Sequence, residues 1–239
     1  MIIVIISDVH ANLEAVNACF KRIDEIKPDK IICLGDMVDY CAQPNEVTEI
    51  IKSRTDAVVL GNHDEAQFNH SLIEGFSENA YISSLHTRKI IQRDYIEYFR
   101  SLPYTYSFEN LFFVHASPAS PGEYDYILNA EAAEYNFNHL SEKICFIGHS
   151  HIPVIFEENK NKVKVVKESS LNKDKRYIIN VGSVGQPRDN DPRLSFGVFD
   201  TDKFQFRLER LQYDIKSASE KIIREGLPLH LAQRLFLGI

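Results

Sequence analysis

The chain has 239 residues and a formal net charge of -7; 44% of its residues are hydrophobic and 26% are charged. This length is ample for a buried core and corresponds to one large domain or two small ones. The acidic balance, with no basic block in the sequence, argues against broad binding to a nucleic-acid backbone or to an anionic membrane surface.

The opening apolar run, residues 2–6, has no basic flank and is too short for the core of a signal peptide or for a membrane span. The cysteines show no C-x-x-C spacing, and Cys33 and Cys145 lie inside apolar runs, where small buried hydrophobic residues belong. We therefore expect reduced, structural cysteines and a cytoplasmic protein that is not exported.

Three strand-and-helix steps make up the first part of the chain. Helices are expected at residues 13–26, where an apolar stripe follows a capping Asn12, and at about 45–53. Because the strands are apolar on both faces, the pattern predicts a parallel sheet covered by helices on both sides. The expected strands are residues 1–6, 31–34 and 57–60.

Polar residues follow these strands at once. If the chain stays extended after the first strand, a period of two places Asp8 and His10 on one face, where both can reach one ion. Gly35 ends the second strand with a sharp turn, so that Asp36 leaves the sheet at its rim. Ligands of open α/β sheets bind at the carboxyl ends of strands, and the two oxygens of a carboxylate there can bridge two metal ions.

Residues 66–110 mix aromatic and charged residues, mostly in helical periodicity. This pattern is typical of an amphipathic pair of helices packed on the core. This is the interpretation we favour; the alternative is a cap over an active site, and one segment can serve both purposes.

Later segments predict further strands at residues 111–114 and 144–147, with a helix near 130–140 between them. From Val154 onward the residues alternate between apolar and polar, which predicts antiparallel strands of a second sheet. A helix near 215–225 and an amphipathic tail close the chain. No repeat or linker interrupts the sequence, so we expect a single domain over residues 1–239 with a cap-like helical segment at about 66–110. The alternating strands are residues 162–166, 176–183, 194–199 and 203–211.

The strand ends carry five polar clusters, each a weak signal alone but hard to assemble by accident in this order. They are D-x-H (Asp8, His10), G-D-x-x-D (Asp36, Asp39), G-N-H-D (Asn62, His63, Asp64), a histidine after an apolar strand (His115) and G-H-x-H (His149, His151).

In these ordered motifs the chain resembles the calcineurin-like metallophosphoesterase superfamily over residues 1 to about 200. The stretch NVGSVGQPRD at residues 180–189 and the tail GLPLHLAQRL further resemble its small bacterial and archaeal phosphodiesterase branch. The resemblance implies an α/β fold, a two-sheet β-sandwich flanked by helices in four layers, with a dinuclear metal site at the strand ends. It also implies the ligands: Asp8, His10, Asp36 and His151 for one ion, and Asp36, Asn62, His115 and His149 for the other.

The ligand types indicate which metals to expect. Oxygen and imidazole ligands without thiolate favour Mn, Fe, Zn, Co or Ni over Ca or Mg, and among these we expect Mn or Fe. Two divalent cations, two aspartates and a bridging hydroxide leave a net charge of about +1, which attracts a phosphoryl group despite the acidic chain. Such a pair of ions lowers the pKa of a shared water toward ~7 and holds it for attack on phosphorus.

Other residues of the motifs suggest roles beside the metals. His63 follows a ligand but is not assigned as one, and it is suited to donate a proton to the departing alkoxide. Asp39 resembles the carboxylate that orients such an imidazole in relatives, with a helix cap as its alternative role. Asn62 and Arg188 are expected to contact substrate, although Arg188 is also compatible with a solvated loop charge. Asp64 is expected to cap the helix that follows it.

These observations predict a dinuclear metal-dependent phosphoesterase that hydrolyses a phosphodiester or nucleotide-like substrate by attack of a metal-bridging hydroxide. Protein serine/threonine phosphatases of the superfamily follow the second aspartate with Arg-Gly, whereas Tyr40 and Cys41 follow Asp39 here, so a phosphoprotein substrate is not expected.

Two enzymes of the same superfamily remain as alternatives, a phosphomonoesterase and a dinucleoside polyphosphate hydrolase. A non-catalytic binding scaffold, as in the retromer subunit that resembles these enzymes, would lack ligand positions that are all filled here. The expected partner is a small phosphorylated substrate, with no nucleic-acid groove and no membrane, and a homo-oligomer is left open.

Overall fold

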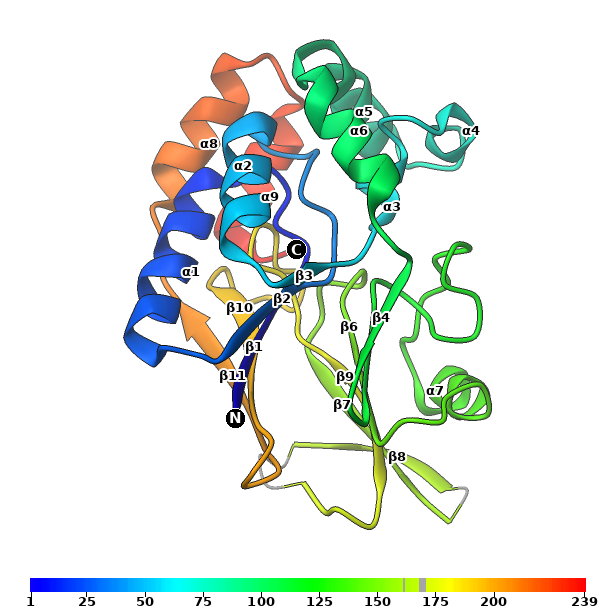
Figure 1. The fold of residues 1–239 in the computed structure, drawn as a ribbon. Coiled ribbons are helices and arrows are strands. Elements are labelled where there is room, and N and C mark those ends of the chain that lie inside the picture. The colour runs from blue at the N-terminus through cyan, green and yellow to red at the C-terminus, as the bar shows by residue number, and fades with distance from the viewer. Residues whose placement is uncertain (161, 168–170) are drawn as a thin grey trace.

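The computed structural model describes residues 1–160, 162–167 and 171–239 (Figure 1). Its strands are β1 (Ile2–Ile6), β2 (Lys30–Cys33), β3 (Ala57–Val58), β4 (Thr105–Phe108), β5 (Leu111–Val114), β6 (Ile144–Ile147), β7 (Val154–Asn159), β8 (Lys162–Val166), β9 (Arg176–Asn180), β10 (Leu194–Asp200) and β11 (Gln205–Leu211). Its helices are α1 (Leu13–Ile26), α2 (Pro44–Arg54), α3 (Asn62–Glu65), α4 (His70–Ile73), α5 (Glu78–Ile90), α6 (Arg93–Ser101), α7 (Ala130–Phe137), α8 (Ile215–Arg224) and α9 (Leu229–Leu237).

Within the described residues the strands form two sheets. The first sheet has the order β11-β10-β1-β2-β3, in which β1, β2 and β3 run parallel, as predicted, and β10 and β11 run antiparallel to their neighbours. The second has the order β4-β5-β6-β9-β7-β8, with β5, β6 and β9 parallel and the outer strands antiparallel.

The two sheets pack face to face between layers of helices (Figure 1). Ile5 and Ile32 of the first sheet meet Phe113 and Phe146 of the second in an apolar layer between them. Helices α1, α2 and α6 bury their apolar residues against the outer face of the first sheet, and α7 covers the second. The four-layer αββα arrangement that the family resemblance implied is therefore confirmed. The prediction of helices on both faces of the first sheet was wrong, because one of its apolar faces packs against the second sheet.

Helix α1 shows how the sequence sets these elements. The side chain of Asn12 accepts a hydrogen bond from the backbone N–H of Ala15 and so caps the helix, as predicted. Lys27 ends the helix in a left-handed conformation directly before Pro28, which cannot continue it. The apolar stripe between these ends faces the first sheet and buries Ala15, Val16, Cys19, Phe20 and Ile23.

The predicted second sheet needs a correction. The strands after Val154 do not form a sheet of their own: β7, β8 and β9 join β4, β5 and β6, whereas β10 and β11 extend the first sheet. Strand β1 has β2 on one side only, so its other edge is free to pair with β10. An alternating pattern shows that a strand has two unlike faces, but it does not show which sheet the strand joins.

Residues 66–110 contain α4, α5 and α6, and also strand β4, which the sequence reading missed. Tyr95 and Phe99 of α6 are buried in the core of the first sheet, so the packing interpretation holds for this helix. Gly75, Phe76, Ser77 and Ala80, before and within α5, line a cavity at the carboxyl ends of the strands. A cap role for the segment remains a proposal.

We expect Phe99→Ala to destabilise the protein by about 3 to 5 kcal/mol, because the ring is fully buried and its loss leaves a cavity in the core. Urea unfolding of the purified variant measures this change. Phe236→Ala is the matched control, since that ring is 51% exposed, and it should cost less than about 0.5 kcal/mol. Equal stability of the two variants would contradict the packing of α6 described above.

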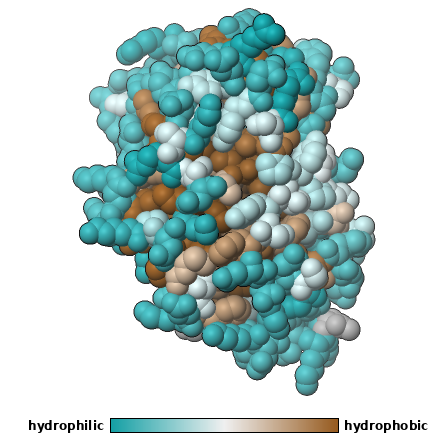
Figure 2. All heavy atoms as spheres, viewed as in Figure 1, coloured by the Kyte–Doolittle hydropathy of each residue, from teal (hydrophilic) through white to brown (hydrophobic). Residues whose placement is uncertain are grey.

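Figure 2 shows hydrophilic residues over most of the face seen in Figure 1, with apolar residues gathered toward its middle. This distribution is ordinary for a globular chain, since polar residues are too few to cover a whole surface. Among residues 1–160, 162–167 and 171–239, no helix combines the length and apolar character needed to cross a membrane.

Candidate metal centre

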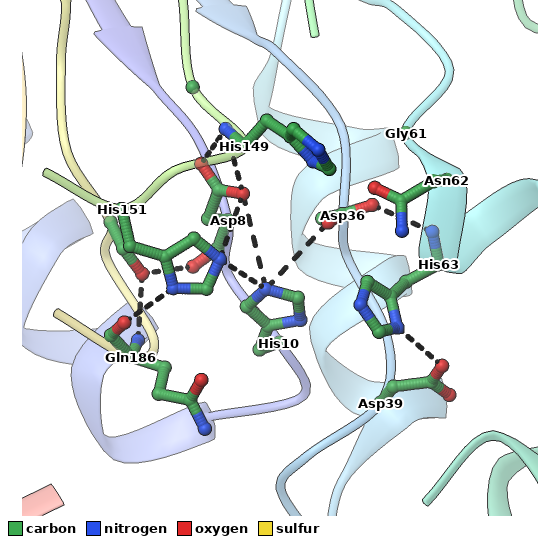
Figure 3. Close-up of polar contacts among 12 residues, drawn as sticks. Asp8, His10, Asp36, Asp39, Gly61, Asn62, His63, His149, His151 and Gln186 are labelled. Atoms are coloured by element: carbon green, nitrogen blue, oxygen red, sulfur yellow. Dashed lines mark hydrogen bonds and ion pairs between the residues drawn. The ribbon is translucent and has the colours of Figure 1, made fainter. Parts of the chain in front are cut away.

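The polar residues after the strands of both sheets converge in one buried cluster (Figure 3). The first sheet contributes residues after β1, β2 and β3, and the second contributes residues after β5 and β6. All of these side chains are buried. The structure thus brings together all the predicted ligands: Asp8, His10, Asp36, Asn62, His115, His149 and His151.

One part of the cluster is a group of four side chains, Asp8, His10, Asp36 and His151, whose ligand atoms all lie within 4.8 Å of one another. The Nε2 atom of His151 is 3.2 Å from Asp8 Oδ1, and the Nε2 atom of His10 is 3.7 Å from Asp36 Oδ2. Two carboxylates and two imidazoles around one point can hold a divalent transition-metal ion.

The second part shares Asp36 with the first. Its carboxylate, His115 and His149 also offer ligand atoms within 4.8 Å of one another. The Nε2 atom of His115 lies 3.3 Å from Asp36 Oδ2, 3.2 Å from the Nδ1 atom of His149 and 3.1 Å from the side-chain oxygen of Asn62. Asp36 is therefore the one side chain common to both groups.

Backbone carbonyls fix the tautomer of three of the imidazoles. The Nδ1 atoms of His10, His115 and His151 lie 2.9, 2.7 and 2.5 Å from the carbonyl oxygens of Val38, Leu34 and Gln186. Since a carbonyl oxygen only accepts, each Nδ1 carries the proton and donates it. In the neutral ring Nε2 is then left with a free lone pair that points into the cluster.

Short contacts between the side-chain atoms of the cluster show whether these residues fit a metal ion. The Nε2 atoms of His10 and His151 lie 3.1 Å apart, and the Nε2 atom of His115 lies 3.1 Å from the Asn62 oxygen. In the neutral rings the Nε2 atoms of His10 and His151 are both acceptors, so no proton lies between them and their lone pairs repel. The Nε2 atom of His115 faces the Asn62 oxygen in the same way only when His115 is deprotonated. A cation bound between the facing lone pairs removes this repulsion, and the donor set therefore fits a divalent ion.

Burial controls the protonation of the cluster. It lowers the pKa of His10 and of His151 well below the usual value, and that of His149 to about 3, so these rings are neutral at neutral pH. Burial alone would also lower the pKa of His115. The negative charge of Asp36 outweighs the effect of burial and raises the pKa of His115 to about 9. Metal binding would thus have to release a proton from His115.

The backbone at the ligands is strained. Asp8, His10, Asp36, His149 and His151 all have positive φ angles, between 48° and 65°. Residues other than glycine adopt this left-handed region at a cost, and such residues cluster at functional sites. The premise of an extended chain at Asp8 and His10 was therefore wrong: these side chains approach each other through turns.

Close packing around Asp36 fixes its carboxylate. A Cβ atom on Gly61 would lie 2.2 Å from Asp36 Oδ1, so only glycine fits there. The Oδ1 atom accepts a hydrogen bond of 2.9 Å from the N–H of His63. The carboxylate of Asp64 accepts bonds of 2.8 Å from the N–H groups of Asp36 and Met37, so Asp64 holds this loop in addition to its predicted role at the start of α3.

His63 lies beside the cluster and is held by Asp39 (Figure 3). Its Nδ1 atom donates to Asp39 Oδ2 over 2.7 Å, and Gln67 donates to the other oxygen of Asp39 over 3.1 Å. Burial would lower the pKa of His63, but the charge of Asp36 and the bond to Asp39 raise it above the usual value. Asp39 orients this imidazole and caps no helix, since α2 begins after Gln43.

The cluster opens into a cavity of about 320 Å³. Arg188 lines it and lies over the ring of Tyr40, with its guanidinium carbon 5.6 Å from the ring centroid, so it is not a solvated loop charge. Tyr126, half exposed, stacks on His149 with the ring centroids 4.1 Å apart. The full lining is Tyr40, Asn62, His63, Gly75, Phe76, Ser77, Ala80, Tyr126, Arg188 and Arg234.

Sequence reasoning missed several of these lining residues. Tyr40 was noted only as a departure from the protein phosphatases, and Tyr126 stands in no motif. Arg234 lies in the tail GLPLHLAQRL, which resembles one branch of the superfamily, and this was the one signal in the sequence for it.

Comparisons with known proteins agree with this geometry. The family model for the calcineurin-like phosphoesterase superfamily domain matches residues 1–203. An uncharacterized protein of Methanocaldococcus jannaschii is 39% identical over 242 residues, which cover 99% of this chain and 98% of that protein.

Solved structures show the same likeness. The crystal structure of a metallophosphoesterase from Sphaerobacter thermophilus superposes with a TM-score of 0.88 at 35% identity, covering 100% of this chain and 99% of the other. A hypothetical protein of Pyrococcus horikoshii superposes with a TM-score of 0.83 at 18% identity, covering 100% of this chain and 98% of the other, and shares the fold.

Proposed function

The chain belongs to the calcineurin-like phosphoesterase superfamily, and on that premise we propose that it hydrolyses phosphoric esters with the help of two divalent metal ions. The observation that carries the proposal is the contact between the Nε2 atoms of the two neutral rings His10 and His151, whose lone pairs face each other over 3.1 Å. A cation bound there would satisfy both lone pairs, and Asp36 is shared between the two groups that could hold one.

When bound, the two ions would activate a water for attack on phosphorus and neutralise charge on the phosphoryl oxygens. Asp8, Asp36, Asn62, His10, His115, His149 and His151 would hold them, with Mn or Fe favoured. Arg188 and Asn62 line the cavity and would contact the substrate, with Arg188 suited to bind phosphate oxygens through its guanidinium group.

His63 is proposed to supply the proton that the leaving group needs. Asp39 orients the ring through Nδ1, so that Nε2 is the atom free to donate. The charge of Asp36 and the bond to Asp39 raise the pKa of His63, which favours the protonated ring that this role needs. A phosphodiester or nucleotide-like molecule is the proposed substrate class, with a phosphomonoester or a dinucleoside polyphosphate as the alternatives within the superfamily.

Metal removal tests the proposal directly. After dialysis against a chelator, we expect hydrolysis of bis-p-nitrophenyl phosphate to be lost, and to return when Mn²⁺ is added but far less with Ca²⁺ or Mg²⁺, because imidazole-rich sites favour transition metals. Metal content is measured on the protein as purified, across a panel of monoesters and diesters. Undiminished turnover by protein shown to be free of metal would refute the proposal.

A further inference from the structure

Two arginines line the cavity beside the metal centre and lie close enough for their charges to interact. Arg188 follows β9 and Arg234 belongs to α9, so they come from separate parts of the chain. Their guanidinium carbons lie 5.6 and 5.8 Å from the centroid of the Tyr40 ring. That ring is in turn 4.5 Å from the ring of His10 and 4.7 Å from that of His63. The two arginines are therefore close to the candidate metal centre, although neither belongs to the ligand groups.

Neither guanidinium forms an ion pair with a carboxylate side chain within the described residues. Arg188 donates from Nη2 to the side-chain oxygen of Gln186 over 3.0 Å, and Arg234 donates from Nε over 2.6 Å to an oxygen of the terminal carboxylate of Ile239. The Nε atom of Arg188 is buried and has no hydrogen-bond partner. Donors of both side chains thus remain available to a ligand.

The acidic residues nearest to Arg188 in the sequence are already engaged. Asp189 pairs with Arg210, and Asp191 pairs with Arg193. The loop that carries Arg188 therefore neutralises its own carboxylates with other arginines and leaves Arg188 free of them.

The fold holds the two arginines together. At the end of α9, the main-chain oxygen of Gly238 accepts a hydrogen bond of 2.8 Å from the N–H of Asn190, in the loop that carries Arg188. Gly238 has a φ angle of 67°, and a Cβ atom there would lie 2.6 Å from the main-chain carbon of Asp191. This close docking holds the end of α9, the helix that carries Arg234, against the loop that carries Arg188.

Bringing two positive charges together in a half-buried wall is unfavourable. Burial and the neighbouring charge of Arg188 lower the pKa of Arg234 to about 10. An anion between the two side chains would remove the repulsion, and planar guanidinium groups match the oxygens of phosphate or carboxylate in forked hydrogen bonds.

We propose that Arg188 and Arg234 together bind a second anionic group of the substrate, a phosphate or carboxylate, while the scissile phosphate lies at the metal centre. This inference rests on the proposed function and narrows it: the substrate is a phosphoester that carries a further negative group near the bond that is cut. Asn62, His63 and the two arginines line one continuous cavity, which lets a single molecule reach both places.

The test compares two esters that differ by one phosphate, thymidine 5'-(p-nitrophenyl phosphate) with and without a phosphate on the 3'-hydroxyl. In the metal-loaded wild-type protein, the 3'-phosphate should lower KM by roughly tenfold, the effect of a charged hydrogen-bonded contact of about 1.5 kcal/mol. Arg234→Gln and Arg188→Gln should each abolish this ratio of KM values. Arg207→Gln is the matched control and should keep the ratio, since Arg207 lies on β11 and pairs with Glu209.

The remaining outcomes distinguish failure of the second anion site from failure of the phosphoesterase proposal. Equal KM values for the two esters in the wild-type protein, or a ratio that survives in both glutamine variants, would overturn the second site and leave the phosphoesterase proposal standing. An equal rise of KM for both esters in Arg234→Gln would assign Arg234 to the scissile phosphate alone, and would also overturn it. No hydrolysis of either ester by the metal-loaded wild-type protein would overturn the proposed function and this inference with it.

Discussion

Asp36→Asn is expected to lose bound metal and hydrolytic activity together. Asp36 is the one side chain shared by both candidate ligand groups, and its Oδ2 atom lies 3.3 Å from His115 and 3.7 Å from His10. Asparagine keeps the size of the side chain but replaces one carboxylate oxygen with an amide NH₂ that cannot bind a cation. Activity should fall by roughly a thousand-fold or more, as when a main stabiliser of charge in the transition state is removed.

Metal analysis of the purified variant and its rate on bis-p-nitrophenyl phosphate measure the two losses. Asp94→Asn is the matched control, because Asp94 is exposed in the first turn of α6, and it should keep both metal and activity. An Asp36→Asn protein that turned the ester over at the wild-type rate would remove the basis for the metal centre.

His63→Asn is expected to keep its metal while its turnover slows. His63 is not among the candidate ligands, and its imidazole is held by Asp39, so the variant should leave the ligand groups intact. If His63 donates the proton, the rate should fall by about 10² to 10⁴ for esters with poor leaving groups such as phenol, and much less for p-nitrophenol, which departs readily as an anion.

Rates on a series of phenyl esters, together with metal content, measure this dependence. Asp39→Asn should act in the same direction, since it removes the acceptor that orients the ring. His139→Asn serves as the control, because that exposed ring contacts only the Tyr135 carbonyl and the Tyr135 ring among the described residues. Equal slowing for good and poor leaving groups would argue against proton donation by His63.

The sequence was most informative where candidate ligands directly follow strands that are neighbours in one parallel sheet. Asp8, Asp36 and Asn62 each follow an apolar strand directly, and parallel strands of one sheet bring their carboxyl ends to the same edge. Their convergence was therefore predictable before the structure was known, as was the four-layer arrangement that the family resemblance implied.

The parts that sequence did not predict depend on long-range packing. Nothing local shows that β10 pairs with β1 while β9 pairs with β6, because both strands read alike as buried apolar segments. Arg234 approaches Arg188 only because α9 docks on a loop more than forty residues away in the sequence. The backbone turns at Asp8 and His10 likewise follow from contacts with the Asp36 loop, whose carbonyl oxygen accepts from the His10 N–H.

The ligand set draws on both sheets, with Asp8, His10, Asp36 and Asn62 from one and His115, His149 and His151 from the other. A folding intermediate with only one sheet complete would carry only part of the proposed ligand set. If metal ions bind there, their binding would therefore stabilise the fully assembled sandwich and not such an intermediate. Any metal-dependent activity would then appear only after both sheets have formed.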